Sequence, residues 1–452
     1  MIRPLFRLIF SLALTSSAYS TQVLPVLLNP IDDLLSDMND NSDFISLNTV
    51  FATKMVDDQV VRFTSQSSNG NLTLDFALFA DATPVTRTNF LKYVSDGDYV
   101  NSIVHRSMPG FVIQGGGYYT EATSSYLVDP VPTDAPIVNE FEISNTYGTI
   151  SMAKLGGAPD SATSQWFVSI GENTDNLDNQ NGGFTVFGRV TNSTLPNAAA
   201  FGNPTNFPVW NAGGALSALP LIDSFDKSRS LTVTDLIRFT SVTLEPIGAN
   251  DAGESTTLSF SIVRNSNPSA ATATITADSK IQLRYLANAT GNTTITVRAT
   301  DSVGNTVDDT FNLSVQSSYD IWRASQFSGD DLANDTISGP SANNRDGLTN
   351  LERYVYNLKD NSTTLNPVEF SETEISSALY PTLTFSIRSN LSDITTRLQS
   401  STDLGQLDPW ETATHVELAR QSNGTTDAIT IRSSTPHSGP KHFYRLQFEL
   451  NE

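Results

Sequence analysis

The chain of 452 residues contains no cysteine and only four histidines. Without cysteine, disulfides, thiolate nucleophiles and cysteine-based zinc sites are all excluded, so packing alone must stabilise the fold. His105 is the only histidine before His415, so no histidine cluster is available for a metal site or a catalytic triad there. We interpret His105 as a structural residue and expect no metal and no cofactor.

Charge is also scarce, and basic charge above all. Charged residues make up 16% of the chain, and 26 Lys and Arg stand against 48 Asp and Glu, a formal net charge of -22. Such a surface repels phosphate backbones and anionic lipid headgroups, so we exclude nucleic acid as a partner. Few charges together with many Ser, Thr and Asn are typical of β-rich extracellular modules.

Hydrophobic runs long enough to span a membrane are absent as well. A membrane-spanning helix needs about 20 apolar residues, and the longest apolar runs of this chain are shorter than that. The apolar run from Leu8 to Leu14 follows Arg3 and Arg7 and is followed by small residues up to Ser20. This is the pattern of a secretory signal peptide cleaved near Ser20. We predict an exported protein, periplasmic or extracellular, with no membrane insertion after cleavage; a retained N-terminal anchor is the alternative.

The length is too great for one ordinary core and suggests about three domains. After Pro246, alternating apolar residues with polar turns predict a small β-sandwich. A third β-rich section follows, with one short helix near Leu348–Leu358. The predicted parts are a signal peptide at 1–20, a poorly ordered linker at 21–44, a barrel domain at 45–245, the β-sandwich at 246–317 and a C-terminal β-rich module at 318–452.

The barrel domain is predicted from short strands separated by turns. In Leu72–Leu78 the apolar residues occupy every second position, the period of a strand with one buried face. Thr83 and Pro84 predict the start of a helix, and Gly97 its end. Many short strands with one or two helices predict a mainly β fold, a closed β-barrel with helical caps. Further strands are predicted at 103–107, 110–114, 148–153, 164–170, 184–190 and 236–244.

Six motifs follow one another in this domain. They are VHRSMPGFVIQGG at 104–116, NEF at 139–141, GTISMA at 148–153, SATSQWF at 161–167, NLD at 176–178 and GFTVFG at 183–188. In order and approximate spacing they resemble the cyclophilin family of peptidyl-prolyl cis/trans isomerases, and its exported bacterial branch in particular. The resemblance covers roughly residues 45–245. It implies a closed, antiparallel, eight-stranded β-barrel with two capping helices and a site on the outer surface of one sheet.

The resemblance also implies a role for individual residues. Arg106 matches the catalytic arginine. Phe111 and Phe167 match residues that wall a pocket for the proline ring, and Gln114 and Gln165 match residues that hydrogen-bond the peptide. The other substrate-binding positions that the resemblance implies are Val112, Ala153, Lys154, Leu177 and Phe184.

Four positions depart from the family pattern. Asn176 stands where many relatives have Trp, which implies weak cyclosporin binding. Phe184 replaces a His and keeps the pocket apolar, Val112 replaces a frequent Met, and Lys154 replaces a frequent Asn. Trp166 lies between two predicted site residues on one strand, so its side chain is expected to point the other way, into the barrel.

These residue types suit rotation about a prolyl amide bond. The barrier to amide rotation is about 18 to 20 kcal/mol, while the cis form of an X-Pro bond lies only about 0.5 to 1 kcal/mol above the trans form. Catalysis therefore needs no nucleophile and no metal. It needs an apolar grip on the ring and a donor that stabilises the twisted amide, which the permanently charged guanidinium of Arg106 can supply.

Other motifs are weaker. Gly115–Gly117 lacks the Lys-Ser/Thr of a phosphate loop and is interpreted as a turn. Residues 344–352 resemble the calcium loops of dockerin and thrombospondin-type repeats. The pattern is degenerate, because the first ligand position falls on Ala342 and the position of the bidentate glutamate falls on Arg353. Calcium binding near Asp346 therefore stays open. The β-sandwich resembles cadherin-like or immunoglobulin-like repeats of bacterial surface proteins.

We predict a non-covalent, arginine-assisted peptidyl-prolyl cis/trans isomerase that acts on proline-containing polypeptides outside the cytoplasm. The C-terminal modules are expected to position the enzyme or to bind a surface or protein partner. The alternative is a non-catalytic protein that binds proline-containing peptides, or an adhesion protein of the cell surface. The intact arginine and pocket residues favour the enzyme.

Overall fold

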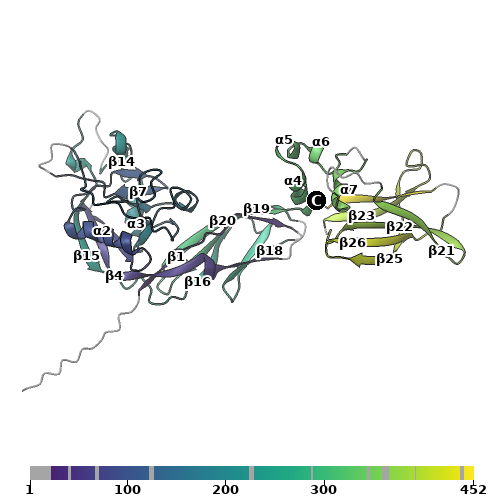
Figure 1. Cartoon of the computed structure of the whole chain (residues 1–452), viewed down its shortest axis with the longest axis horizontal. Helices are drawn as coiled ribbons and strands as arrows, with labels where there is room; N and C mark the ends of the chain where they lie inside the picture. The colour runs from purple at the N-terminus through teal and green to yellow at the C-terminus, as the bar shows by residue number, and fades with distance from the viewer. Residues whose placement is uncertain are drawn as a thin grey trace, which may run out of the picture. The chain divides into compact units, whose positions relative to one another are not determined.

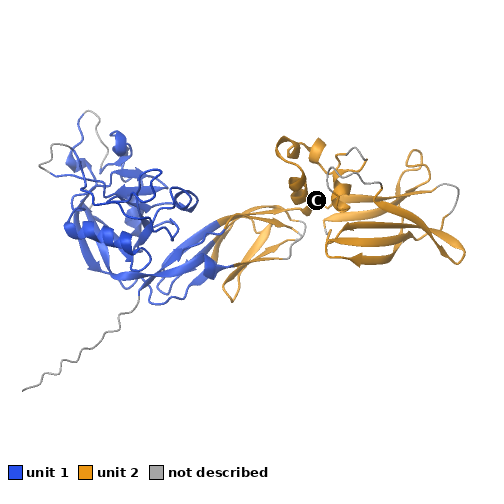
Figure 2. Cartoon of the chain, in the orientation of Figure 1, with its two compact units in different colours: residues 1–31, 46–261, 297–310 blue, residues 32–45, 262–296, 311–452 orange. Residues whose placement is uncertain are grey.

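The computed structural model describes residues 22–38, 42–66, 71–121, 127–222, 229–286, 289–343, 347–358, 366–391, 393–437 and 442–451 (Figure 1). Two compact units are distinguished in Figure 2: residues 1–31, 46–261 and 297–310 form unit 1, and residues 32–45, 262–296 and 311–452 form unit 2. The predicted signal peptide lies outside the described residues. No described helix is long and apolar enough to cross a membrane.

Unit 1 is built on a nine-stranded antiparallel sheet. Its order is β1-β4-β5-β12-β10-β11-β7-β6, and β15 also pairs with β4. Each strand predicted in this part of the chain has a counterpart. The bounds are β1 (Val23–Leu27), β4 (Phe51–Gln66), β5 (Leu72–Phe79), β6 (Arg106–Met108), β7 (Val112–Gly115), β10 (Thr149–Met152), β11 (Trp166–Ser169), β12 (Val186–Val190) and β15 (Arg238–Pro246).

The prediction of a closed eight-stranded barrel is wrong in both respects, because the sheet has nine strands and forms a half-barrel. Among the described residues, an isolated bridge pairs Ile103, in the segment before β6, with Arg238 of β15. Two backbone hydrogen bonds flank that bridge, from Val104 to Ile237 at 3.1 Å and from Phe239 to Ser102 at 2.9 Å. The segment before β6 turns instead of extending, so no continuous ladder closes the sheet.

The two predicted capping helices are α2 (Pro84–Asp96) and α3 (Leu195–Phe201). Helix α2 ends, as predicted, at Gly97, which adopts a left-handed φ of 81°. At its start, however, the Thr83 side chain makes no capping hydrogen bond. The carboxylate of Glu140 accepts hydrogen bonds from the N–H groups of Val85 and Thr86 at 3.1 and 2.8 Å instead. A carboxylate at this end also complements the helix dipole.

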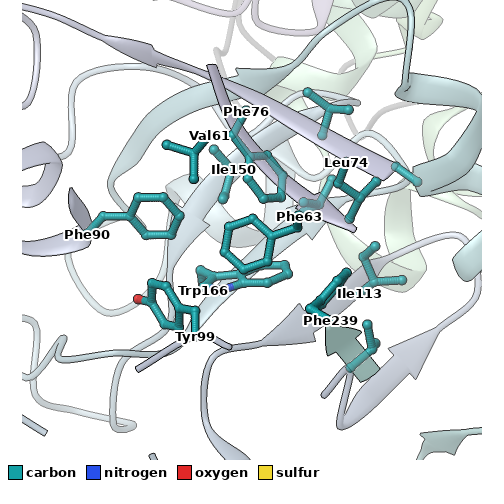
Figure 3. Close-up of a cluster of buried hydrophobic side chains, with 14 of the residues drawn as sticks. Val61, Phe63, Leu74, Phe76, Phe90, Tyr99, Ile113, Ile150, Trp166 and Phe239 are labelled. Atoms are coloured by element: carbon teal, nitrogen blue, oxygen red, sulfur yellow. The ribbon is translucent and has the colours of Figure 1, made fainter. Parts of the chain in front are cut away.

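The core of unit 1 lies between the sheet and the helices and is rich in aromatic rings (Figure 3). Phe63 of β4 is at its centre and is completely buried. Trp166 of β11 is also completely buried, which confirms that it points away from the predicted site. The ring of Phe63 lies with its centroid 5.1 to 6.2 Å from the ring centroids of Phe76, Phe90, Tyr99, Trp166 and Phe239.

The prediction of a poorly ordered linker at 21–44 is wrong for much of that segment. Val23–Leu27 forms β1, which is buried along its whole length and pairs with Phe51–Met55 of β4. Farther along, β2 (Leu34–Asp37) pairs in parallel with β20. The frequent Asp and Asn residues of this segment suggested a linker, but its apolar residues have partners far away in sequence.

The predicted sandwich region contains two sheets, of order β16-β19-β20-β2 and β17-β18-β3. Their cadherin-like or immunoglobulin-like character stays a prediction. The strands are β3 (Asp43–Ser46), β16 (Ser259–Asn265), β17 (Ala271–Ile275), β18 (Lys280–Tyr285), β19 (Gly291–Thr300) and β20 (Thr306–Gln316).

The C-terminal part has two further sheets, of order β21-β22-β26-β25 and β24-β23-β27. The helix predicted near 348–358 is α7 (Asn350–Val355), which begins with a capping box between Thr349 and Glu352. Part of the calcium-loop resemblance, at 344–346, lies outside the described residues, and no described group of acidic or histidine side chains could hold a metal. The other elements are α4 (Ser318–Gln326), α5 (Gly329–Leu332), α6 (Asp335–Ser338), β21 (Val368–Ile375), β22 (Ala378–Arg388), β23 (Ile394–Ser401), β24 (Glu411–Thr412), β25 (His415–Ser422), β26 (Thr426–Ser433) and β27 (Phe443–Leu450).

Candidate active site

Strands β6, β7 and β11 place the predicted polar residues on one face of the sheet. Arg106 lies directly opposite Gln114, and Gln114 lies directly opposite Phe167. Directly opposed residues of antiparallel strands point to the same face. Gln165 precedes Phe167 by two positions and therefore shares this face, while Trp166 between them points into the core.

The polar side chains on this face form a chain of hydrogen bonds. The Nε2 group of Gln114 donates to Oε1 of Gln165 at 2.9 Å. Nη1 of Arg106 donates to Oε1 of Gln114 at 3.4 Å. No ion pair among the described residues includes Arg106. Gln114 therefore orients the guanidinium group without neutralising it, and the remaining N–H groups stay available to a ligand.

An apolar cluster lies beside this polar row. Val112, Phe167 and Leu177 are buried at its base, with Phe111, Ala153 and Phe184 partly buried around them. The rings of Phe167 and Phe184 meet edge to face, with centroids 5.7 Å apart. The guanidinium carbon of Arg106 lies 5.9 Å from the ring centroid of Phe111. The structure thus brings the Arg106 cation against an apolar cluster, a suitable arrangement for a small ring next to a polar bond.

Two buried asparagines hold the loops of this cluster, and neither was predicted as a site residue. Nδ2 of Asn173 donates to the carbonyl of Phe111 at 3.0 Å, and the carbonyl of Asn173 accepts from the N–H of Leu177 at 2.7 Å. Nδ2 of Asn145 donates to the carbonyl of Phe184 at 3.0 Å. The sequence offers no signal for these roles, because the loop backbones that they satisfy are distant along the chain.

The side chain of Lys154 is turned toward the chain itself. Its Nζ donates hydrogen bonds to the carbonyl oxygens of Asn181 and Gly183 and to Oδ1 of Asn139. It also lies 4.7 Å from the ring centroid of Phe184. Burial lowers the pKa of Lys154 from its ordinary value. The ammonium group of Lys154 thus holds the turn that carries Phe184. The resemblance places a substrate contact on the backbone of this position, and that contact stays a prediction.

The glycines after β7 leave room for Trp166. A Cβ atom at Gly115 would lie 2.6 Å from Cζ2 of Trp166, and one at Gly116 would lie 2.6 Å from the carbonyl oxygen of Ser164. Gly116 also has a positive φ of 72°, a conformation that side chains disfavour. These glycines are therefore needed for close packing as well as for the predicted turn.

His105 is buried next to Arg106, the predicted catalytic residue. It is 2% exposed, and its Nδ1 has no hydrogen-bonding partner among the described atoms. Burial and, to a smaller extent, the charge of Arg106 together lower its pKa to about 4, although a hydrogen bond with Gln165 opposes the shift. His105 is therefore neutral at pH 7, which agrees with a structural role.

The depressed pKa of His105 predicts a pH-dependent stability of unit 1. Below pH 6.5 the unfolded chain takes up a proton at this residue, whereas the folded chain does so only near pH 4. Stability is therefore lost as pH falls through this window, by about 2 to 3 kcal/mol between pH 6.5 and 4.5. Urea unfolding read by pulsed hydrogen exchange of peptides from β4 and β11 measures this loss.

Because carboxylates titrate in the same range, the informative quantity is the difference between variants. His105→Phe is expected to lose about 2 to 3 kcal/mol less than the wild type over this pH interval. The matched variant is His415→Phe, in the fully exposed strand β25, which should behave like the wild type. An equal pH response of all three proteins would contradict the assignment.

Comparison with known proteins agrees with the predicted domain. Residues 60–195 match a family model described as cyclophilin type peptidyl-prolyl cis-trans isomerase/CLD. A peptidyl-prolyl cis-trans isomerase of Acinetobacter baylyi is 38% identical over 124 residues, 27% of this chain and 61% of that protein. Peptidyl-prolyl cis-trans isomerase A of Dickeya dadantii is 39% identical over 128 residues, 27% of this chain and 62% of that protein.

The chain spans about three fifths of the length of these curated relatives. A solved cyclophilin type isomerase of Cryptosporidium parvum aligns at 23% identity over 42% of this chain and 99% of its own, with a TM-score of 0.28, too low to add support. The family model and the relatives support a cyclophilin-type isomerase domain. The exported bacterial branch stays a prediction.

Proposed function

We propose that this protein is a peptidyl-prolyl cis/trans isomerase that accelerates rotation about X-Pro bonds in polypeptides. The observation that carries the proposal is the position of Arg106, 5.9 Å from the ring centroid of Phe111 and hydrogen-bonded to Gln114, beside an apolar cluster. The match of residues 60–195 to the isomerase family and the names of the curated relatives support it.

In the proposed mechanism the apolar cluster of Phe111, Phe167 and Phe184 receives the proline ring. Rotation pyramidalises the prolyl nitrogen, which regains its lone pair as resonance is lost. A guanidinium N–H of Arg106 donates to that nitrogen only in the twisted state, so the interaction lowers the barrier. Gln114 and Gln165 hydrogen-bond the flanking backbone, and no covalent intermediate forms.

We also propose that the substrates are exported polypeptides and that the protein works in the periplasm or outside the cell. The support is the charged and apolar pattern at the N-terminus, the lack of cysteine and the low content of charge. The modules after residue 245 are proposed to position the isomerase domain or to bind a surface or protein partner. Cell fractionation, followed by detection of the protein in each fraction, tests the location. Recovery of the protein in the cytosol alone would exclude export.

The activity is tested by following cis-to-trans relaxation of an Ala-Pro peptide in the presence of the full chain. Relaxation without enzyme takes tens to hundreds of seconds, slow enough to detect acceleration directly. A rate that rises in proportion to protein concentration is expected. Peptide binding without acceleration would overturn the isomerase and favour the alternative of a proline-peptide-binding or adhesion protein.

A further inference from the structure

Unit 2 contains a cavity of about 690 Å³ between α4, α7 and the end of β22. Its volume lies in the range of about 300 to 1,000 Å³ that is usual for small-molecule sites. Trp322 of α4 and Tyr354 of α7 form an apolar wall, and Arg388 at the end of β22 contributes a cation. The lining residues all belong to unit 2, whereas the candidate active site belongs to unit 1, so the two sites share no residue.

Arg388 is held in place at one edge of its guanidinium group. Its Nε donates to the carbonyl oxygen of Tyr354 at 2.7 Å, and its guanidinium carbon lies 4.9 Å from the ring centroid of Tyr354. No described residue accepts a hydrogen bond from either of its Nη groups. The fixed side chain therefore presents two unused donors on one fork, the geometry that matches a carboxylate or a phosphate.

Among the described residues this cation has no counter-ion. No described carboxylate forms an ion pair with Arg388, although the chain carries 48 acidic residues against 26 basic ones. Partial burial lowers the pKa of Arg388 from its ordinary value. Keeping a partly desolvated charge unpaired is unfavourable, and an anionic ligand in the cavity would remove this penalty.

The other groups of the cavity favour a singly charged anion. Asp37 also lines it, and the carboxylate of Asp37 accepts a hydrogen bond from the hydroxyl of Ser318. One cation and one anion in the lining of the cavity disfavour a doubly charged phosphate, whereas a carboxylate is matched by one guanidinium fork. The apolar wall of Trp322 and Tyr354 requires that the ligand also carry an apolar body.

We propose that the cavity binds a carboxylate attached to a compact apolar group, with the carboxylate on the Nη groups of Arg388 and the apolar group against Trp322 and Tyr354. Two sources have this chemistry: a free small acid, and the C-terminal carboxylate of a polypeptide. The site assigns a ligand-binding function to the C-terminal part of the chain, independent of the isomerase.

Calorimetric titration of the full chain tests the proposal with paired probes. N-acetylphenylalanine is expected to bind at least tenfold more tightly than N-acetylphenylalaninamide, because only the acid can form the paired hydrogen bonds to Arg388. The peptide Ala-Ala-Ala-Phe with a free C-terminus distinguishes the sources: tighter binding than the single residue indicates a chain end, and equal binding a free acid. The proposal would be overturned if the acid and the amide bound equally tightly, or if inorganic phosphate bound as tightly as N-acetylphenylalanine.

Variants locate the site. Arg388→Met is expected to weaken binding of N-acetylphenylalanine at least tenfold, while Arg397→Met is expected to leave it unchanged, because Arg397 pairs with Glu449 on β23 and β27. Arg388→Lys keeps the charge without the fork and should fall between them. If Arg388→Met fails to fold, the comparison of acid and amide on the wild type still decides. Unchanged binding by a folded Arg388→Met protein would place the ligand elsewhere and refute the site.

Discussion

Replacing Arg106 by alanine is expected to lower kcat/KM for an Ala-Pro peptide by about 100-fold, because the variant loses the donor that the proposed mechanism places at the prolyl nitrogen in the twisted state. The effect should appear in kcat more than in KM, since the apolar cluster that is proposed to bind the ring is left intact. Cis-to-trans relaxation at increasing peptide concentration separates the two. Arg106→Lys keeps the charge but has no fork held by Gln114, so an intermediate loss is expected.

The matched control is Arg238→Ala, in β15 of the same sheet. Among the described residues, the side chain of Arg238 donates a hydrogen bond only to Gln66, at 3.0 Å on the exposed surface. This variant should keep the wild-type rate. If Arg106→Ala retained more than about a third of the wild-type kcat/KM, transition-state stabilisation by this residue would be worth less than about 1 kcal/mol. The arginine-assisted mechanism would then be wrong even if the isomerase were real.

Truncating Phe63 to alanine is expected to lower the free energy of unfolding of unit 1 by about 3 to 5 kcal/mol. Phe63 is completely buried, and five aromatic rings surround it (Figure 3). Because these neighbours belong to different elements of the fold, they cannot move as a group to fill the cavity that the truncated side chain leaves. Urea unfolding, followed by pulsed hydrogen exchange of peptides from β4 and β11, reports this unit separately from the rest of the chain.

Leu244→Ala serves as the control for this variant. Leu244 lies on β15, which pairs with β4, but its side chain is 48% exposed. A loss below about 1 kcal/mol is therefore expected. Phe63→Leu should fall between the two variants because it leaves a smaller cavity. Equal losses for Phe63→Ala and Leu244→Ala would mean that the aromatic cluster does not dominate the stability of unit 1.

The arrangement of the candidate site was largely predictable. The side chains of Gln165, Trp166 and Phe167 point alternately to the two faces of the sheet. This alternation alone predicts that Gln165 and Phe167 lie at the site and that Trp166 lies in the core. The structure brings all ten predicted site residues together, while their roles in binding and catalysis stay predictions. The hydrogen bonds by which the ammonium group of Lys154 holds the turn of Phe184 were not predicted.

The unpredicted features all depend on partners that are distant in sequence. Glu140 caps α2 from 54 residues away, in place of the adjacent Thr83. Asn173 supports the loop of Phe111 across 62 residues. Strand β1 lies in a segment whose polar residues suggested a linker, and only its pairing with β4 explains why it is buried. Local propensity carries no information on such contacts.

By itself the sequence determined the mainly β character of the chain, the start and end of α2 and the set of residues at the candidate site. Periodicity, turn residues and short motifs are local properties, and they remain readable without the fold. Tertiary structure alone decided that the sheet stays a half-barrel, that Val23–Leu27 joins it, and that Arg388 lines a cavity with no counter-ion among the residues that the structure describes. These outcomes depend on which distant groups meet and which remain unpaired, because burial and pairing energies arise only when the chain has folded.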